Sequence, residues 1–105
     1  MRLEDLKQAL RRGLVHISDH ADDEANQDAL SLDEIYSSLY SGEIIEDYPT
    51  DRPYPSCLVM GYSSRSEPVH SVWAYNERTG FAVLVTVYRP DPERWYDNYT
   101  KRRYR

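Results

Sequence analysis

The sequence predicts a single α+β domain in which N-terminal helices pack on a C-terminal antiparallel sheet. Apolar residues recur at helical spacing between residues 3 and 39, and β-rich runs follow one another between residues 56 and 88. The length of 105 residues suits one hydrophobic core. We therefore predict one domain over residues 1–95, followed by a basic C-terminal tail over residues 96–105.

Three helices are predicted in the N-terminal half. The first covers residues 3–12 and carries leucines at helical spacing. The second begins after a cap at Ser18 or Asp19 and runs through HADDEAN, and a short edge strand is expected just before it, over residues 14–17. The third begins at the capping box that Ser31 forms with Glu34, and it ends before Gly42.

Strands dominate the rest of the chain. A short strand around EII leads into a proline-stiffened loop over residues 47–55. The runs SCLVMGY, VHSVWAY and FAVLVTVY then predict an antiparallel meander, and the loop of residues 76–80 joins the last two runs as a hairpin. Trp95 is expected to fold back over the edge of the core.

Alternation along the last run predicts which side chains face the helices. Val83, Val85 and Val87 share one face of that strand, and we expect this face to be buried. On this interpretation Val85→Asp abolishes folding. The expected centre of the core comprises Leu6, Leu10, Ile35, Leu39, Val83, Val85 and Val87.

Composition narrows the function classes. The net charge is −5, with acids concentrated between residues 19 and 51 and a basic KRRYR ending, so a general nucleic-acid coat is not expected. No run approaches the roughly 20 apolar residues of a membrane helix, which favours a cytoplasmic protein without membrane contact. One cysteine, Cys57, within an apolar run indicates packing, and three dispersed histidines predict neither a metal site nor a cofactor.

Several motifs carry a resemblance to a known family. They are His20-Ala21 at a helix start, SGEIIEDYP, DRPYPSCLVMG, PVHSVWAY and TVYRPDPERW. In this order they resemble the family called domain of unknown function 4258, from Ile17 to Trp95. That family resembles the RelE and MqsR ribonuclease toxins in its helix-then-sheet order, and its members often look like toxins paired with a zinc-finger helix-turn-helix antitoxin.

The resemblance implies a RelE-like fold and a toxin-like endoribonuclease, an mRNA interferase of a toxin–antitoxin pair. Its substrate would be RNA, on the ribosome or free, and its partner an antitoxin. Metal-independent RNA cleavage needs an acid, a base and cations for the phosphorane charge. The predicted catalytic residues are His20, His70, Tyr88 and Arg89, and the predicted substrate-binding residues are Arg52, Thr86 and Tyr75.

Each candidate also has a structural interpretation. His20 and His70 are also interpreted as packing contacts in the fold, and Arg52 and Arg89 have nearby acids to pair with. Family members commonly carry arginines after the His-Ala pair, whereas this chain has Glu24 and Gln27 at those positions. This difference favours a second hypothesis, a non-catalytic protein-binding module that retains the toxin-like fold and binds through its exposed sheet and its ten tyrosines.

Overall fold

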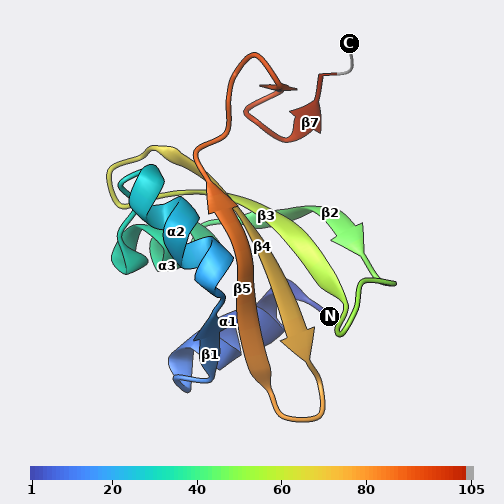
Figure 1. Ribbon diagram of the computed structural model, residues 1–105. Helices are drawn as coiled ribbons and strands as arrows, with labels where there is room; N and C mark the ends of the chain where they lie inside the picture. Colours follow the sequence, from blue (N-terminus) through green and yellow to red (C-terminus); the bar gives the residue numbers. More distant parts are fainter. Residues whose placement is uncertain (104–105) are drawn as a thin grey trace.

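A computed structural model describes residues 1–103 and confirms the α+β class. Figure 1 shows the helices gathered on one side of a twisted sheet. The helices are α1 (Leu3–Arg11), α2 (Asp19–Gln27) and α3 (Leu32–Tyr40). The strands of the sheet, in the spatial order β1-β5-β4-β3-β2, are β1 (Val15–Ile17), β5 (Phe81–Tyr88), β4 (Pro68–Asn76), β3 (Ser56–Tyr62) and β2 (Glu43–Tyr48).

An antiparallel sheet was predicted, but the sheet is mixed. β3 to β5 form the expected antiparallel meander and β2 extends it antiparallel to β3, whereas β1 pairs with β5 in parallel. The short run before α2 was expected at an edge, and it does lie at one. Its direction depends on how the chain leaves α1, and a three-residue run contains no signal of that direction.

Local sequence signals position α2 and α3. The Ser18 hydroxyl accepts the amide hydrogen of Ala21 and the Ser31 hydroxyl accepts that of Glu34, so both predicted caps are confirmed. α3 then lies directly against β3. A Cβ atom at Gly61 would come within 1.7 Å of the Ser38 carbonyl oxygen, so only glycine allows this approach.

The core lies between the helices and the sheet face that they cover. Of the predicted centre, Leu6, Ile35, Leu39 and Val87 are fully buried there, and Leu10 packs against the cluster at its margin. Trp73 and Leu84 are the large buried side chains that the sheet contributes. The helical part of the predicted core is therefore confirmed.

The predicted orientation of β5 is wrong. Ala82 and Leu84 face the helices and are fully buried, whereas Val85 is 37% exposed on the opposite face. A β-bulge interrupts the alternation of faces along β5. Thr86 pairs with Val72 and Leu84 with Trp73, which leaves Val85 as an extra residue. After the bulge Val87 returns to the core, so Val85→Asp is not expected to abolish folding.

The segment of residues 91–103, here called the C-terminal cap, follows β5. It contains a small hairpin of β6 (Trp95–Tyr96) and β7 (Lys101–Arg102), which lies beyond the end of β5 in Figure 1. Trp95 folds back and is buried as expected, while the residues after it are ordered in the hairpin up to residue 103. Residues 104 and 105 of the predicted tail lie outside the described residues. Within residues 1–103 no helix has the length and apolarity needed to cross a bilayer.

Candidate functional site

The sheet face turned away from the helices, here called the second face, carries the candidate site. Cross-strand pairs place Tyr88 beside His70 and Thr86 beside Val72 on this face. The C-terminal cap contacts the end of the face that holds His70. The other end, near Val83, is open.

His70 has a defined tautomer beneath the cap. Its side chain is fully buried, and Nε2 lies 2.7 Å from the carbonyl oxygen of Tyr99. A carbonyl only accepts hydrogen bonds, so Nε2 carries the hydrogen and Nδ1 is left to accept from the Tyr88 hydroxyl, 3.1 Å away. Burial lowers the pKa of His70, which keeps the imidazole neutral and leaves Nδ1 unprotonated.

An ion pair anchors the cap over this histidine. The Arg102 guanidinium donates to both carboxylate oxygens of Glu46 on β2, at 2.7 and 2.9 Å, and lies 4.7 Å from the centroid of the Trp95 ring. Hydrogen bonding to Arg102 lowers the pKa of Glu46. The Tyr48 hydroxyl also donates to Glu46, and burial together with that carboxylate raises the pKa of Tyr48 to about 12.

Tyr88 opens onto a pocket of about 760 Å³ beside the cap, here called the cap pocket. Four arginines and two acids line it, and two of these arginines, Arg89 and Arg102, form ion pairs with acids outside the pocket. Among residues 1–103 the Arg94 side chain has no hydrogen-bond or ion-pair partner. The lining residues are Tyr88, Arg89, Asp91, Glu93, Arg94, Trp95, Arg102 and Arg103.

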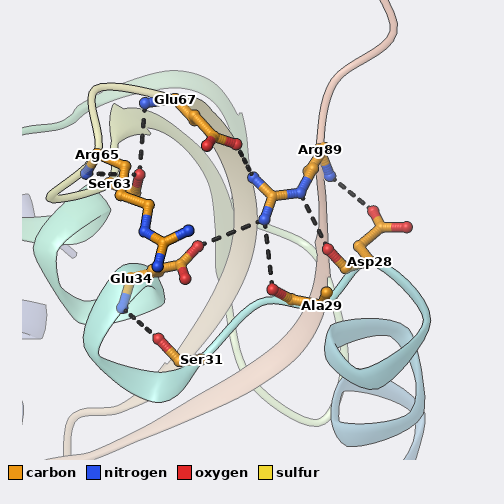
Figure 2. Close-up of polar contacts among 8 residues, drawn as sticks. All are labelled: Asp28, Ala29, Ser31, Glu34, Ser63, Arg65, Glu67 and Arg89. Carbon is orange, nitrogen blue, oxygen red and sulfur yellow. Dashed lines mark hydrogen bonds and ion pairs between the residues drawn. The ribbon is translucent and has the colours of Figure 1, made fainter.

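Arg89 borders the cap pocket, but its guanidinium is engaged in the fold (Figure 2). It donates to the carbonyl oxygens of Asp28 and Ala29 at the end of α2, and it pairs with Glu67 at 2.6 Å and Glu34 at 3.4 Å. These contacts join α2, α3 and the β3–β4 loop to the end of β5. The geometry therefore gives Arg89 a positioning role in the fold.

The acids of α2 have a structural task that explains their presence. Beyond β1 the edge of β5 is unpaired, and its amide hydrogens at Val87 and Arg89 are accepted by Glu24 and Asp28. Glu24 lies on α2 and Asp28 is its C-cap residue, so the two are four positions apart, the spacing that places two side chains on one helix face. The predicted catalytic His20 is exposed and lies 3.2 Å from the same Glu24, at the opposite end of α2 from Arg89.

The predicted substrate-binding residues are dispersed. Thr86 lies on the second face, whereas Tyr75 packs against the helix-side core. Arg52 lines a separate pocket of about 340 Å³, here called the loop pocket, at the open end of the second face. Of the predicted residues, the structure brings only His70, Tyr88 and Thr86 to one part of that face.

Sequence reasoning missed the residues that complete the site. Glu46 and Arg102 lie 56 positions apart and meet only because the cap folds back over β2. The arginines in KRRYR were the available signal, but the sequence does not show where that segment returns. Arg94 and Arg103 were likewise missed, although Trp95 between them was expected to return to the core.

No metal centre is present among the described residues, since none of their histidine, cysteine and carboxylate side chains form a group of three or more ligands. Cys57 is buried, and burial raises the pKa of its thiol to about 12, so it is a poor nucleophile. The chemistry available is that of the tyrosine–histidine pair beside arginines.

The fold and this site define a small α+β domain in which a buried histidine is hydrogen-bonded to a partly buried tyrosine beside a C-terminal cap. A family model described as a domain of unknown function (DUF4258) matches residues 17–89, more than half of the chain, and the protein belongs to that family. The match ends at Arg89, before the cap. No curated protein and no solved structure matches the chain.

Proposed function

We propose that this protein is a toxin-like endoribonuclease that cleaves RNA without a metal ion. The observation that supports it best is the Tyr88–His70 pair, which is oriented by the Tyr99 carbonyl and opens through Tyr88 onto a pocket lined by arginines. A base behind a hydroxyl, held in one tautomer by a third group, is the arrangement that activates oxygen nucleophiles in enzymes.

In the proposed reaction the 2′-hydroxyl of RNA attacks the adjacent phosphorus. The Tyr88 oxygen takes the 2′ proton while its own proton moves to Nδ1 of His70, so the buried imidazole is the final base. The bond between phosphorus and the 5′ oxygen breaks, and that oxygen takes a proton from solvent. The products are a 2′,3′-cyclic phosphate and a 5′-hydroxyl end.

Arginines of the cap pocket would stabilise the phosphorane. Arg94 has no partner within residues 1–103, and Arg103 uses its Nε to hold the carbonyl oxygens of Pro92 and Trp95. Guanidinium groups match phosphate oxygens in geometry and charge. Arg89 would act through the fold, because its donors are already taken by α2, Glu34 and Glu67.

The charge of the chain limits encounter with free RNA. A net charge of −5 repels phosphate over long range, so we expect weak cleavage of naked RNA and faster cleavage where a ribosome positions it. The resemblance to toxins further implies an antitoxin partner. We expect a separately encoded protein to hold the activity in check.

The test compares Tyr88→Phe with Tyr75→Phe. Both substitutions remove one hydroxyl, but Tyr88 faces the cap pocket and Tyr75 packs against the core. We expect Tyr88→Phe to lower the cleavage rate of RNA by about 10² to 10⁴, the usual contribution of a general base. Tyr75→Phe should cleave like the wild type.

Cleavage is measured in chelator with and without ribosomes, and the product ends are identified. Activity abolished by the chelator, or equal activity in the two variants, would refute the mechanism. Induced expression of each variant in bacteria extends the test, since growth arrest should require the Tyr88 hydroxyl.

A second candidate function is non-catalytic protein binding. It is favoured by the use of His20, Glu24 and Arg89 in contacts within the fold and by the full burial of His70. In that case induced expression of the wild type leaves RNA intact, and growth is unaffected by the Tyr88→Phe substitution.

A further inference from the structure

The loop pocket lies at the end of the second face that the cap does not contact. A continuous row of paired residues crosses four strands there, from His16 through Val83 and Ala74 to Ser56. The loop of residues 51–54 forms a further wall. The cavity of about 340 Å³ is at the small end of the range for ligand pockets, which suits one compact molecule.

The floor of the loop pocket is apolar and open to solvent. Val85 is 37% exposed at the bulge of β5, and Val83 is partly exposed two residues before it. Ala74, which pairs with Val83 from β4, adds only a methyl group. Tyr54 supplies an aromatic side chain to the wall. A flat heteroaromatic ring covers such a surface without leaving polar atoms buried, because its hydrogen-bonding groups lie at its edge.

The rim of the loop pocket adds uncommitted cationic and polar groups. Neither the Arg52 guanidinium nor the His16 imidazole has a hydrogen-bond or ion-pair partner within residues 1–103. The loop itself is held, since the Ser56 hydroxyl donates to the Asp51 carboxylate. A guanidinium on a fixed loop at the border of an apolar slot is suited to a phosphate attached to a ring.

We infer that the loop pocket binds one nucleotide, with the base on Val83 and Val85 and the phosphate on Arg52. This inference rests on the proposed function, because it assigns the pocket to a nucleotide of the RNA that is cleaved. β5 connects the two sites: Val85 and Tyr88 are three residues apart on the strand, or about 10 Å. The nucleotide in the loop pocket is therefore a neighbour of the one that reacts at Tyr88.

The probe is AMP, with adenosine and inorganic phosphate as its parts. Binding to the full chain is measured by calorimetry and located from amide NMR signals. We expect AMP to bind more tightly than either part and to shift the signals of Ala74, Val83 and Val85. Arg52→Ala should weaken AMP about tenfold, the loss of one charge-assisted hydrogen bond, and leave adenosine unchanged.

Val85→Asp should weaken both AMP and adenosine at least tenfold, because it puts a carboxylate on the apolar floor. Arg78→Ala is the matched control, since Arg78 lies in the β4–β5 loop outside the pocket and should bind AMP like the wild type. For RNA cleavage, Arg52→Ala should raise KM and leave kcat unchanged.

Tyr88→Phe separates the two proposals, because it should abolish cleavage and leave AMP binding intact. Cleavage by a chain whose loop pocket binds no AMP would overturn the inference and leave the proposed function standing. AMP binding without any RNA cleavage would refute the proposed function and leave the nucleotide-binding pocket standing. AMP affinity that is the same in Arg52→Ala and Val85→Asp as in the wild type would also overturn it.

Discussion

Leu84 and Val85 are neighbours on β5, yet they belong to two very different sides of the sheet. The helix-covered side seals Leu84 completely, together with Trp73, Leu6 of α1 and Leu39 of α3. The second face is covered only at one end, by a short cap, and Val85 lies 37% exposed on the open part. An apolar residue in a strand thus predicts contact with some other part of the structure. Whether that residue becomes core or lines an open site depends on which elements pack on its side of the sheet.

The largest expected effect separates these two residues directly. Leu84→Asp places an unpaired carboxylate in the sealed core, at a cost comparable with the roughly 5 to 15 kcal/mol of stability that small domains have. We expect this variant to be unfolded. Val85→Asp places the same group on the partly exposed second face, where the carboxylate can reach water, and should lower the free energy of unfolding by less than about 1 kcal/mol.

Circular dichroism shows whether each variant is folded, and chemical denaturation gives its free energy of unfolding. A cooperative transition in Leu84→Asp like that of the wild type, or an unfolded Val85→Asp, would mean that β5 presents the opposite faces. Because the second variant also enters the nucleotide-binding test, its folding has to be established first.

The same pair of residues shows how far the sequence could predict the fold. Helix caps and periodicity are local, so Ser31, Leu6 and Leu39 could be placed correctly. The bulge at Val85 is a mismatch between two strands, and alternation within β5 contains no trace of it.

The candidate site was less predictable for a related reason. His70 and Tyr88 could be chosen by chemical type and do meet, but their role depends on a carbonyl at Tyr99 and on the cap that supplies it. Arg89 has the right chemistry for binding phosphate, but its guanidinium already donates to the end of α2, to α3 and to the β3–β4 loop. A sequence shows the type of each residue, whereas only the structure shows whether its side chain is already used in hydrogen bonds and ion pairs.

Two arginines offer a sharper test of the comparison, because each anchors a different side. Arg89 joins the helical layer to the end of β5, and its side chain is mostly buried, so Arg89→Ala leaves several acceptors without a donor. We expect a loss of about 2 kcal/mol in the free energy of unfolding.

Arg102→Ala is the matched variant on the second face. Its pair with Glu46 is about half exposed on the arginine side, and such pairs contribute below about 1 kcal/mol. We expect global stability to change little while the cap loosens, which Trp95 fluorescence would report. Equal losses of stability in the two variants would show that the cap is as integral to the fold as the helices.

The smallest expected effect concerns pH and the histidine under the cap. Burial lowers the pKa of His70 below its usual 6.5, so the unfolded chain takes up a proton that the folded chain refuses. Above pH 6.5 the imidazole is neutral in both states and has no effect on stability. As the pH falls below 6.5 stability is lost, at a rate of at most about 1.4 kcal/mol per pH unit for this one proton.

The loss from His70 stops once the pH is below the pKa of the folded state, because both states then bind the proton. Urea denaturation of the wild type and of His70→Gln between pH 7.5 and 5 isolates this contribution, since most carboxylates titrate at lower pH. The variant should show a flatter dependence. An NMR titration of the His70 ring in the wild type gives the same information without substitution. Protonation of that ring at or above its usual pKa would show that the cap admits water, and the second face would then be open at both ends.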